Sequence, residues 1–196
     1  MSDGGRADSS EPLPDSGRSD AGMRDAGPTD GGTDAGPMDA GPMCPDDGVD
    51  DTYMMATDLG DIDDDAGYPF DTAMGNIFPI TDQDWYMWHV NDGFFADVDP
   101  RAGLSARPVG VAWELCLYFE CDSTTDSVGC EGDGTPHTLV EGEIEGCCAV
   151  STEASTSITL APSCSGLDDS GNVYVRISRQ GGTATCEGYT LTWGDA

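Results

Sequence analysis

The chain has 196 residues, enough for one domain and a tail, and a formal net charge of −31 that arises from 38 acidic residues against seven basic ones. All seven basic residues are Arg, and no Lys occurs. Nucleic acids and anionic lipid surfaces are bound through Lys and Arg that neutralise phosphates, so the composition argues against both as partners. No run of 18 apolar residues is present, and we therefore predict no transmembrane segment.

Residues 1–47 are predicted to form a disordered acidic linker. From Asp20 onward an Asp-Ala-Gly unit recurs, mostly followed by Pro, and β-branched and aromatic residues are nearly absent. Such a segment cannot bury enough apolar surface to offset the entropy lost on ordering, and its Pro and Asp residues keep it extended. The segment resembles the stalks of bacterial surface lipoproteins, which follow a lipid-bearing Cys. Here the first Cys is Cys44, at the far end of the segment, and residues 1–20 lack the basic and apolar regions of a signal peptide.

Residues 48–196 are predicted to form an all-β domain. Short runs rich in β-branched and aromatic residues, separated by turn signals, predict strands. The predicted strands cover residues 72–78, 84–90, 111–120, 148–152, 157–160, 173–178 and 189–193. Pro79 is expected to confine the first of them to a sheet edge or a strand end. No window carries a helical i, i+3, i+4, i+7 stripe. Short antiparallel strands in this number predict a β-sandwich or jelly roll.

The run from Asp82 to Val90 is the most strongly patterned strand. Because strand side chains alternate, Tyr86, Trp88 and Val90 share one face, while Trp85, Met87 and His89 share the other. The same alternation predicts buried faces on two further strands, formed by Trp113, Leu115, Leu117 and Phe119 and by Val173, Val175 and Ile177.

Eight cysteines are expected to form a disulfide framework in an exported protein. They are Cys44, Cys116, Cys121, Cys130, Cys147, Cys148, Cys164 and Cys186. Adjacent Cys147 and Cys148 should have different partners. One arrangement joins Cys121 to Cys130 and Cys164 to Cys186, although spacing alone does not choose among the pairings. The alternative is a zinc site at which His137 joins Cys130, Cys147 and Cys148, but the paired C-x₂-C spacing of structural zinc sites is missing.

Four segments in order resemble the bacterial pre-peptidase C-terminal domain. They are Ala56-Thr-Asp-Leu-Gly60, Asp82-x-Asp84-Trp85-Tyr86, Val173-Tyr-Val-Arg-Ile177 and Tyr189-Thr-Leu191. The resemblance spans roughly residues 44–196 and implies a β-sandwich of the kind found on secreted proteases and on non-enzymatic surface proteins. The Glu and Pro that usually open the family's pattern are absent before Asp50. The cysteine-rich insert between Cys116 and Cys148 also departs from that pattern.

The resemblance also implies a calcium site. In calcium-binding members of the family the acidic segment at the start of the domain and the acids before the Asp-Trp motif together bind the ion, which corresponds here to Asp50, Asp51, Asp82 and Asp84. Carboxylate oxygens are ligands that calcium prefers, whereas solvated surface acids are the alternative in so acidic a chain. A second acidic group, Asp61, Asp63, Asp64 and Asp65, lacks the Gly and Glu of an EF-hand loop, and we interpret it as an exposed loop.

The sequence contains no nucleophile, metal-hydrolase or phosphate-binding motif, so we predict that the protein is not an enzyme. Trp85, Tyr118 and Tyr174 could contact a sugar ring or an extended polypeptide if their sheet face is exposed, or cover the sheet if it is not. The leading hypothesis is a calcium-stabilised extracellular or cell-surface module that binds polysaccharide or protein or serves a structural role. The alternatives are an accessory domain of a secreted hydrolase whose catalytic domain lies outside this chain, and a passive spacer.

Overall fold

The computed structural model describes residue 44 and residues 52–64, 70–93, 97–139, 143–182 and 186–196. The chain divides into two compact units, residues 1–39 and 40–196, and all described residues lie in the second. Apart from Cys44, the predicted linker over residues 1–47 lies outside the described residues. No helix in the described part of the chain has the length and apolar character needed to cross a membrane.

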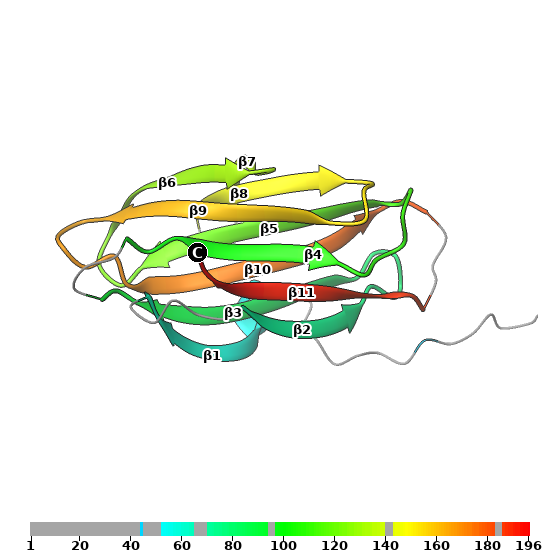
Figure 1. Cartoon of the computed structure of the whole chain (residues 1–196), viewed down its shortest axis with the longest axis horizontal. Coiled ribbons are helices and arrows are strands. Elements are labelled where there is room, and N and C mark those ends of the chain that lie inside the picture. The colour runs from blue at the N-terminus through cyan, green and yellow to red at the C-terminus, as the bar shows by residue number, and fades with distance from the viewer. Residues whose placement is uncertain (1–43, 45–51, 65–69, 94–96, 140–142, 183–185) are drawn as a thin grey trace, which may run out of the picture. The chain divides into compact units, whose positions relative to one another are not determined.

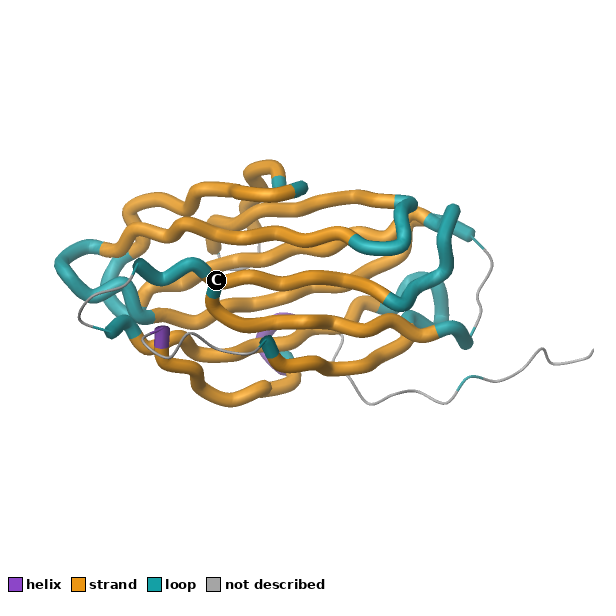
Figure 2. The backbone as a smooth tube through the Cα atoms, in the orientation of Figure 1, coloured by secondary structure: helices purple, strands orange, loops and turns teal. Residues whose placement is uncertain are grey.

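The described residues form two β-sheets that pack face to face, and most of these residues lie in strands (Figures 1 and 2). The six-stranded sheet has the order β1 (Thr57–Asp63), β3 (Gln83–Asn91), β10 (Gly171–Gln180), β5 (Ala112–Cys121), β8 (Ile144–Ser151) and β7 (Thr135–Leu139). The five-stranded sheet has the order β2 (Asp71–Asn76), β11 (Gly188–Asp195), β4 (Pro100–Ser105), β9 (Thr156–Cys164) and β6 (Thr125–Gly132). Only β1, which pairs with β3, runs parallel to a neighbour among the described strands. The all-β sandwich prediction is confirmed.

Alternating side chains from both sheets fill the space between them. Tyr86, Trp88 and Val90 lie in this core, as their alternation predicts, and the apolar faces of β5 and β10 lie opposite residues such as Leu104 and Leu191 of the other sheet. Trp88 and Trp193 pack with ring centroids 5.3 Å apart, which joins β3 to β11. Burial of these large apolar side chains is the main term that holds the sheets together.

Four strands were not predicted from the sequence: β1, β4, β6 and β7. Strand β4 begins at Pro100 and contains Gly103, both of which disfavour a strand, yet it lies between β9 and β11. Strands β6 and β7 are sheet edges with mostly exposed side chains, and so they carry little alternation. The interpretation of the second acidic group as a loop is wrong for Asp61 and Asp63, which belong to β1.

All eight cysteines form disulfides, and two of the four bridges join the sheets. Cys121–Cys164 links β5 to β9, and Cys130–Cys147 links β6 to β8. The predicted pairs Cys121–Cys130 and Cys164–Cys186 are therefore wrong. The pairing of β6 with β9 explains this: it places Cys164 opposite Thr125, at the start of β6 near Cys121, whereas Cys130 lies further along β6, opposite Leu160, and bonds to Cys147 of β8. The prediction that Cys147 and Cys148 have different partners is confirmed.

The remaining two bridges lie outside the space between the sheets. Cys116–Cys148 joins directly opposed residues of β5 and β8, with Cα atoms 4.1 Å apart. Cys44, within the predicted linker, is bonded to Cys186, two residues before β11 begins. Four disulfides indicate an oxidising, extracytoplasmic environment, because such bridges do not persist in a reducing cytosol.

Candidate functional site

The predicted aromatic contacts lie on the outer face of the six-stranded sheet, but two of them are covered. Trp85 is 4% exposed and Tyr118 is 0% exposed, because they stack with ring centroids 6.0 Å apart and Tyr53 lies over Trp85. Tyr174 is half-buried, and its hydroxyl donates to Glu120. Burial and the Glu120 carboxylate raise the Tyr174 pKa to about 12. Trp85 and Tyr118 thus cover the sheet, whereas Tyr174 as a ligand contact stays a prediction.

The predicted calcium ligands are only partly described. Asp50 and Asp51 lie outside the described residues. Asp82 accepts hydrogen bonds from the backbone amides of Phe78 and Gln83 at 3.2 and 2.9 Å. Asp84 is 0% exposed and accepts a hydrogen bond from the Tyr189 hydroxyl. Both carboxylates therefore have structural roles within the protein, and calcium binding by the four residues stays a prediction.

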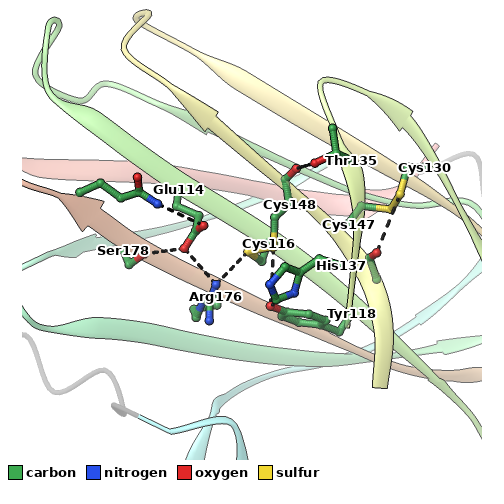
Figure 3. The surroundings of a disulfide bond; sticks show 12 residues. Glu114, Cys116, Tyr118, Cys130, Thr135, His137, Cys147, Cys148, Arg176 and Ser178 are labelled. Carbon is green, nitrogen blue, oxygen red and sulfur yellow. Dashed lines mark hydrogen bonds and ion pairs between the residues drawn. A yellow bond between two sulfur atoms is a disulfide. The ribbon is translucent and has the colours of Figure 1, made fainter. Parts of the chain in front are cut away.

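A connected polar network surrounds the Cys116–Cys148 disulfide on this outer face (Figure 3). Register places Trp85, Arg176, Cys116 and Cys148 in one row across β3, β10, β5 and β8. Arg176 lies between Glu114 and the disulfide: its Nη2 is 2.9 Å from Glu114 Oε2 and 3.2 Å from Cys116 Sγ. The guanidinium also lies over the Trp85 ring, 5.9 Å from its centroid. The disulfide is therefore flanked by a partly buried cation.

The other sulfur of this disulfide faces a phenol. The Tyr118 hydroxyl is 3.6 Å from Cys148 Sγ and 3.2 Å from His137 Nδ1 on the edge strand β7. Gly146 makes this arrangement possible, because a Cβ there would lie 2.8 Å from Tyr118 Cδ1 and 2.0 Å from the Leu117 carbonyl oxygen. The network thus continues from Arg176 through the disulfide to an exposed imidazole.

The zinc alternative does not fit this geometry. Cys130, Cys147 and Cys148 are all oxidised in disulfides and have no thiolate to offer a metal. The ligand atoms of Glu114, Cys116 and Cys148 lie within 4.8 Å of one another, but two of these three are disulfide sulfurs.

A groove lies on the outer face of the five-stranded sheet, across β4, β9 and β11. It has a volume of about 360 Å³. Gly103 pairs with Thr192 on one side and with Ser157 on the other, so hydroxyl groups flank a position that has no side chain. A Cβ at Gly103 would have no contact shorter than 3.7 Å. The groove follows β4 from Arg101 to Ser105, a length of about 13 Å at the usual rise of a strand.

The groove carries both hydrogen-bond donors and acceptors. Arg101 lies over the Phe70 ring, 5.4 Å from its centroid, and is the one exposed Arg among the described residues. Within the same described ranges, no carboxylate lies close enough to Arg101 to form an ion pair. Asp133 is held by Thr156 Oγ1 at 2.9 Å and by the Ser157 amide at 3.2 Å.

Acidic side chains converge close to the C-terminus of the chain. Asp195 accepts a hydrogen bond from the Asp99 amide at 2.8 Å. Burial, with the nearby carboxylates of Asp99 and Asp64, raises the Asp195 pKa to about 6. Burial, together with Glu131 and Asp97, also raises the pKa of Asp99. These groups repel one another at neutral pH and hold protons more tightly than solvated acids do.

No family model, curated protein or solved structure matches the chain. The structure has the two-sheet sandwich that the resemblance to the pre-peptidase C-terminal domain implies, and it is described by that fold without a family assignment.

The groove was not predicted from the sequence. Its residues come from β4, β9 and β11, from the turn that follows β6, and from Phe70 and Ser155 directly before β2 and β9, and only Arg101-Ala-Gly103-Leu-Ser105 carries a local signal. In that segment Ala102 and Leu104 alternate with three residues that face outward. This pattern is typical of a half-buried strand, but Pro100 and Gly103 both disfavour a strand and so weaken the signal.

Proposed function

We propose that the β-sandwich is a non-catalytic extracellular module that is displayed at the cell surface by its acidic linker and binds neutral saccharide in the groove over Gly103. The observation that carries this proposal is the groove itself, whose floor is open and whose rim consists of hydroxyl groups, one guanidinium and one carboxylate. Four disulfides support the extracellular setting.

The chemistry of the rim suits a sugar. Saccharide hydroxyls both donate and accept hydrogen bonds, and Thr192 and Ser157 can do the same. Arg101 only donates, and the Asp133 carboxylate only accepts, so the rim offers fixed partners of both kinds. Phe70 adds an apolar surface at the Arg101 end, on which the C–H groups of a sugar ring can pack. The volume of about 360 Å³ lies at the lower end of the range for small-ligand sites.

Charge favours a neutral saccharide over a polyanionic one. The chain carries a net charge of −31, and its field repels polyanions as they approach. Arg101 reduces the negative potential only close to its guanidinium, which lies over the Phe70 ring. Neutral polysaccharides carry no charge to be repelled and offer many hydroxyl groups.

The test is a glycan array on the full chain, followed by calorimetry with the best neutral ligand. Gly103→Val should abolish binding, because it fills the floor of the groove while a β-branched residue suits a strand. Ala161→Val is the matched control, since it adds bulk to the same sheet outside the groove and should bind as the wild type does. Arg101→Gln should weaken binding at least tenfold. Absence of any neutral glycan ligand at millimolar concentration, or unchanged binding by Gly103→Val, would refute the proposal.

A further inference from the structure

The Cys116–Cys148 disulfide differs from the two bridges between the sheets in the groups that touch its sulfur atoms. Cys121, Cys164 and Cys147 are buried in the core, and Cys130 packs against it. Cys116 Sγ instead receives a hydrogen bond from Arg176 at 3.2 Å, and Cys148 Sγ lies 3.6 Å from the Tyr118 hydroxyl. A neutral disulfide gains little from a guanidinium, whereas the thiolate formed when the bond breaks gains a charge-assisted hydrogen bond.

This asymmetry determines which sulfur leaves. In thiol–disulfide exchange an incoming thiolate attacks one sulfur and the other departs with the electron pair, faster when its thiolate is better stabilised. Cationic neighbours stabilise thiolates. We propose that Cys116–Cys148 is a thiol-exchange site at which a small-molecule thiol adds to Cys148 and Cys116 leaves as a thiolate held by Arg176. This inference is independent of the saccharide groove.

The exchange takes place in two steps. The incoming thiol loses its proton to solvent, its sulfur bonds to Cys148 Sγ, and the Cys116–Cys148 bond breaks with the electron pair on Cys116. A second thiol, after losing its proton to solvent, can then attack the small-molecule sulfur of this mixed disulfide, and the bond to Cys148 breaks with the electron pair on Cys148. Both cysteines are then reduced, and the two small thiols are joined as a disulfide. The reductant is thus two equivalents of a monothiol.

Exposure also favours attack on Cys148. Cys148 is 7% exposed, whereas Cys116 is 0% exposed. Cys148 lies beside the edge strand β7, in which Thr135, Pro136, His137 and Thr138 are exposed. Short edge strands open more readily than central ones, so movement of β7 gives a route to Cys148.

The fold should survive the exchange. Strands β5 and β8 remain paired from Trp113 to Tyr118, and the neighbouring Cys130–Cys147 bridge still ties β8 to the other sheet. The reaction can therefore be followed in native protein.

Substitution of Glu114 provides a control that should change the exchange rate in the opposite direction to substitution of Arg176. Its carboxylate lies 2.9 Å from Arg176 Nη2 and also accepts hydrogen bonds from Ser178 and Gln180. Glu114 therefore competes with a Cys116 thiolate for the same guanidinium. Removing the Glu114 charge should strengthen the stabilisation of the thiolate, and removing the Arg176 charge should abolish it.

The experiment measures how fast glutathione adds to the oxidised full chain in native buffer. Samples are quenched in acid, digested with pepsin and mapped by mass spectrometry. The peptide map separates adducts on Cys186, which is exposed, from adducts on Cys148. We expect the adduct on Cys148, formed at least fivefold more slowly in Arg176→Gln, at least twofold faster in Glu114→Gln, and at close to the wild-type rate in Arg176→Lys.

A purely structural role for the Glu114–Arg176 pair predicts a different pattern. Loss of either partner would loosen the sheet, and both Arg176→Gln and Glu114→Gln would then accelerate exchange. That result would overturn the proposal, as would an adduct on Cys116 or the absence of any adduct at Cys116–Cys148 while the protein stays folded.

Discussion

Replacement of Tyr189 by Phe should destabilise the protein more than replacement of Tyr86 by Phe, although both changes remove one buried hydroxyl. Tyr189 donates to the carboxylate of Asp84, which is 0% exposed, and its oxygen lies 2.7 Å from the Tyr86 hydroxyl. Burial and the Asp84 carboxylate raise the pKa of Tyr189, so its proton stays available as the donor.

The size of the effect follows from these contacts. A hydrogen bond to a charged group contributes about 1.5–3 kcal/mol, and one between neutral groups contributes about 1 kcal/mol. Tyr189→Phe removes both bonds and should lower the free energy of unfolding by about 2–4 kcal/mol. Tyr86→Phe removes the bond between the two hydroxyl groups and leaves the Tyr189–Asp84 bond in place, so it should cost about 1 kcal/mol.

The assay is urea unfolding at pH 7, followed by tryptophan fluorescence, on both variants and the wild type. Equal losses for the two variants, or a loss below about 0.5 kcal/mol for Tyr189→Phe, would refute the reasoning that the Tyr189–Asp84 bond is the stronger one. If a variant also loses tryptophan fluorescence in buffer without urea, its core has repacked. A crystal structure of that variant would show the rearrangement.

Three further predictions concern cross-links, pH and calcium. Cys44→Ser/Cys186→Ser should lower the free energy of unfolding by up to about 5 kcal/mol on the chain-entropy model, because this bridge spans 142 residues. The Cys130–Cys147 bridge closes a loop of only 17 residues, and its loss should cost about 3 kcal/mol. A denaturant midpoint that does not fall in the Cys44→Ser/Cys186→Ser variant would contradict this prediction. The folded protein raises the Asp195 pKa to about 6, so protonated Asp195 stabilises the folded state; this stabilisation is fully present below pH 3.8 and is lost as the pH rises through 6. Asp195→Asn should therefore raise the melting temperature at pH 7 and leave it unchanged at pH 3.5. If the predicted calcium site exists, calcium at about one hundred times its dissociation constant should add about 2.7 kcal/mol to stability, and identical melting midpoints in calcium and in chelator would remove that prediction.

The core could be predicted because it depends on local alternation. Side chains alternate along a strand, so the inward direction of Tyr86, Trp88 and Val90 in β3 follows from their positions in the sequence alone. The alternation did not reveal that the outer face of this sheet would also be covered. Tyr53, which covers Trp85, belongs to a short 3₁₀ turn (η1, Tyr53–Met55) that carries no periodic signal.

The disulfide pairs and the groove could not be predicted because both depend on the order of strands in the sheets. Cys116 meets Cys148 only because β5 and β8 are neighbours, and Cys121 meets Cys164 only because their strands lie in facing sheets. In the same way, Gly103 lies between two hydroxyl groups because β4 separates β11 from β9. Residues far apart in the sequence form each of these sites, and their spacing along the chain does not indicate that they come together.

The most direct test of the account is a disulfide map of the unreduced protein after export to an oxidising compartment. Peptide mass spectrometry should recover four bridges, Cys44–Cys186, Cys116–Cys148, Cys121–Cys164 and Cys130–Cys147, and no reactive thiol. Recovery of Cys121–Cys130 or Cys164–Cys186, or of four or more free thiols in folded protein, would contradict the sandwich on which both proposed sites depend.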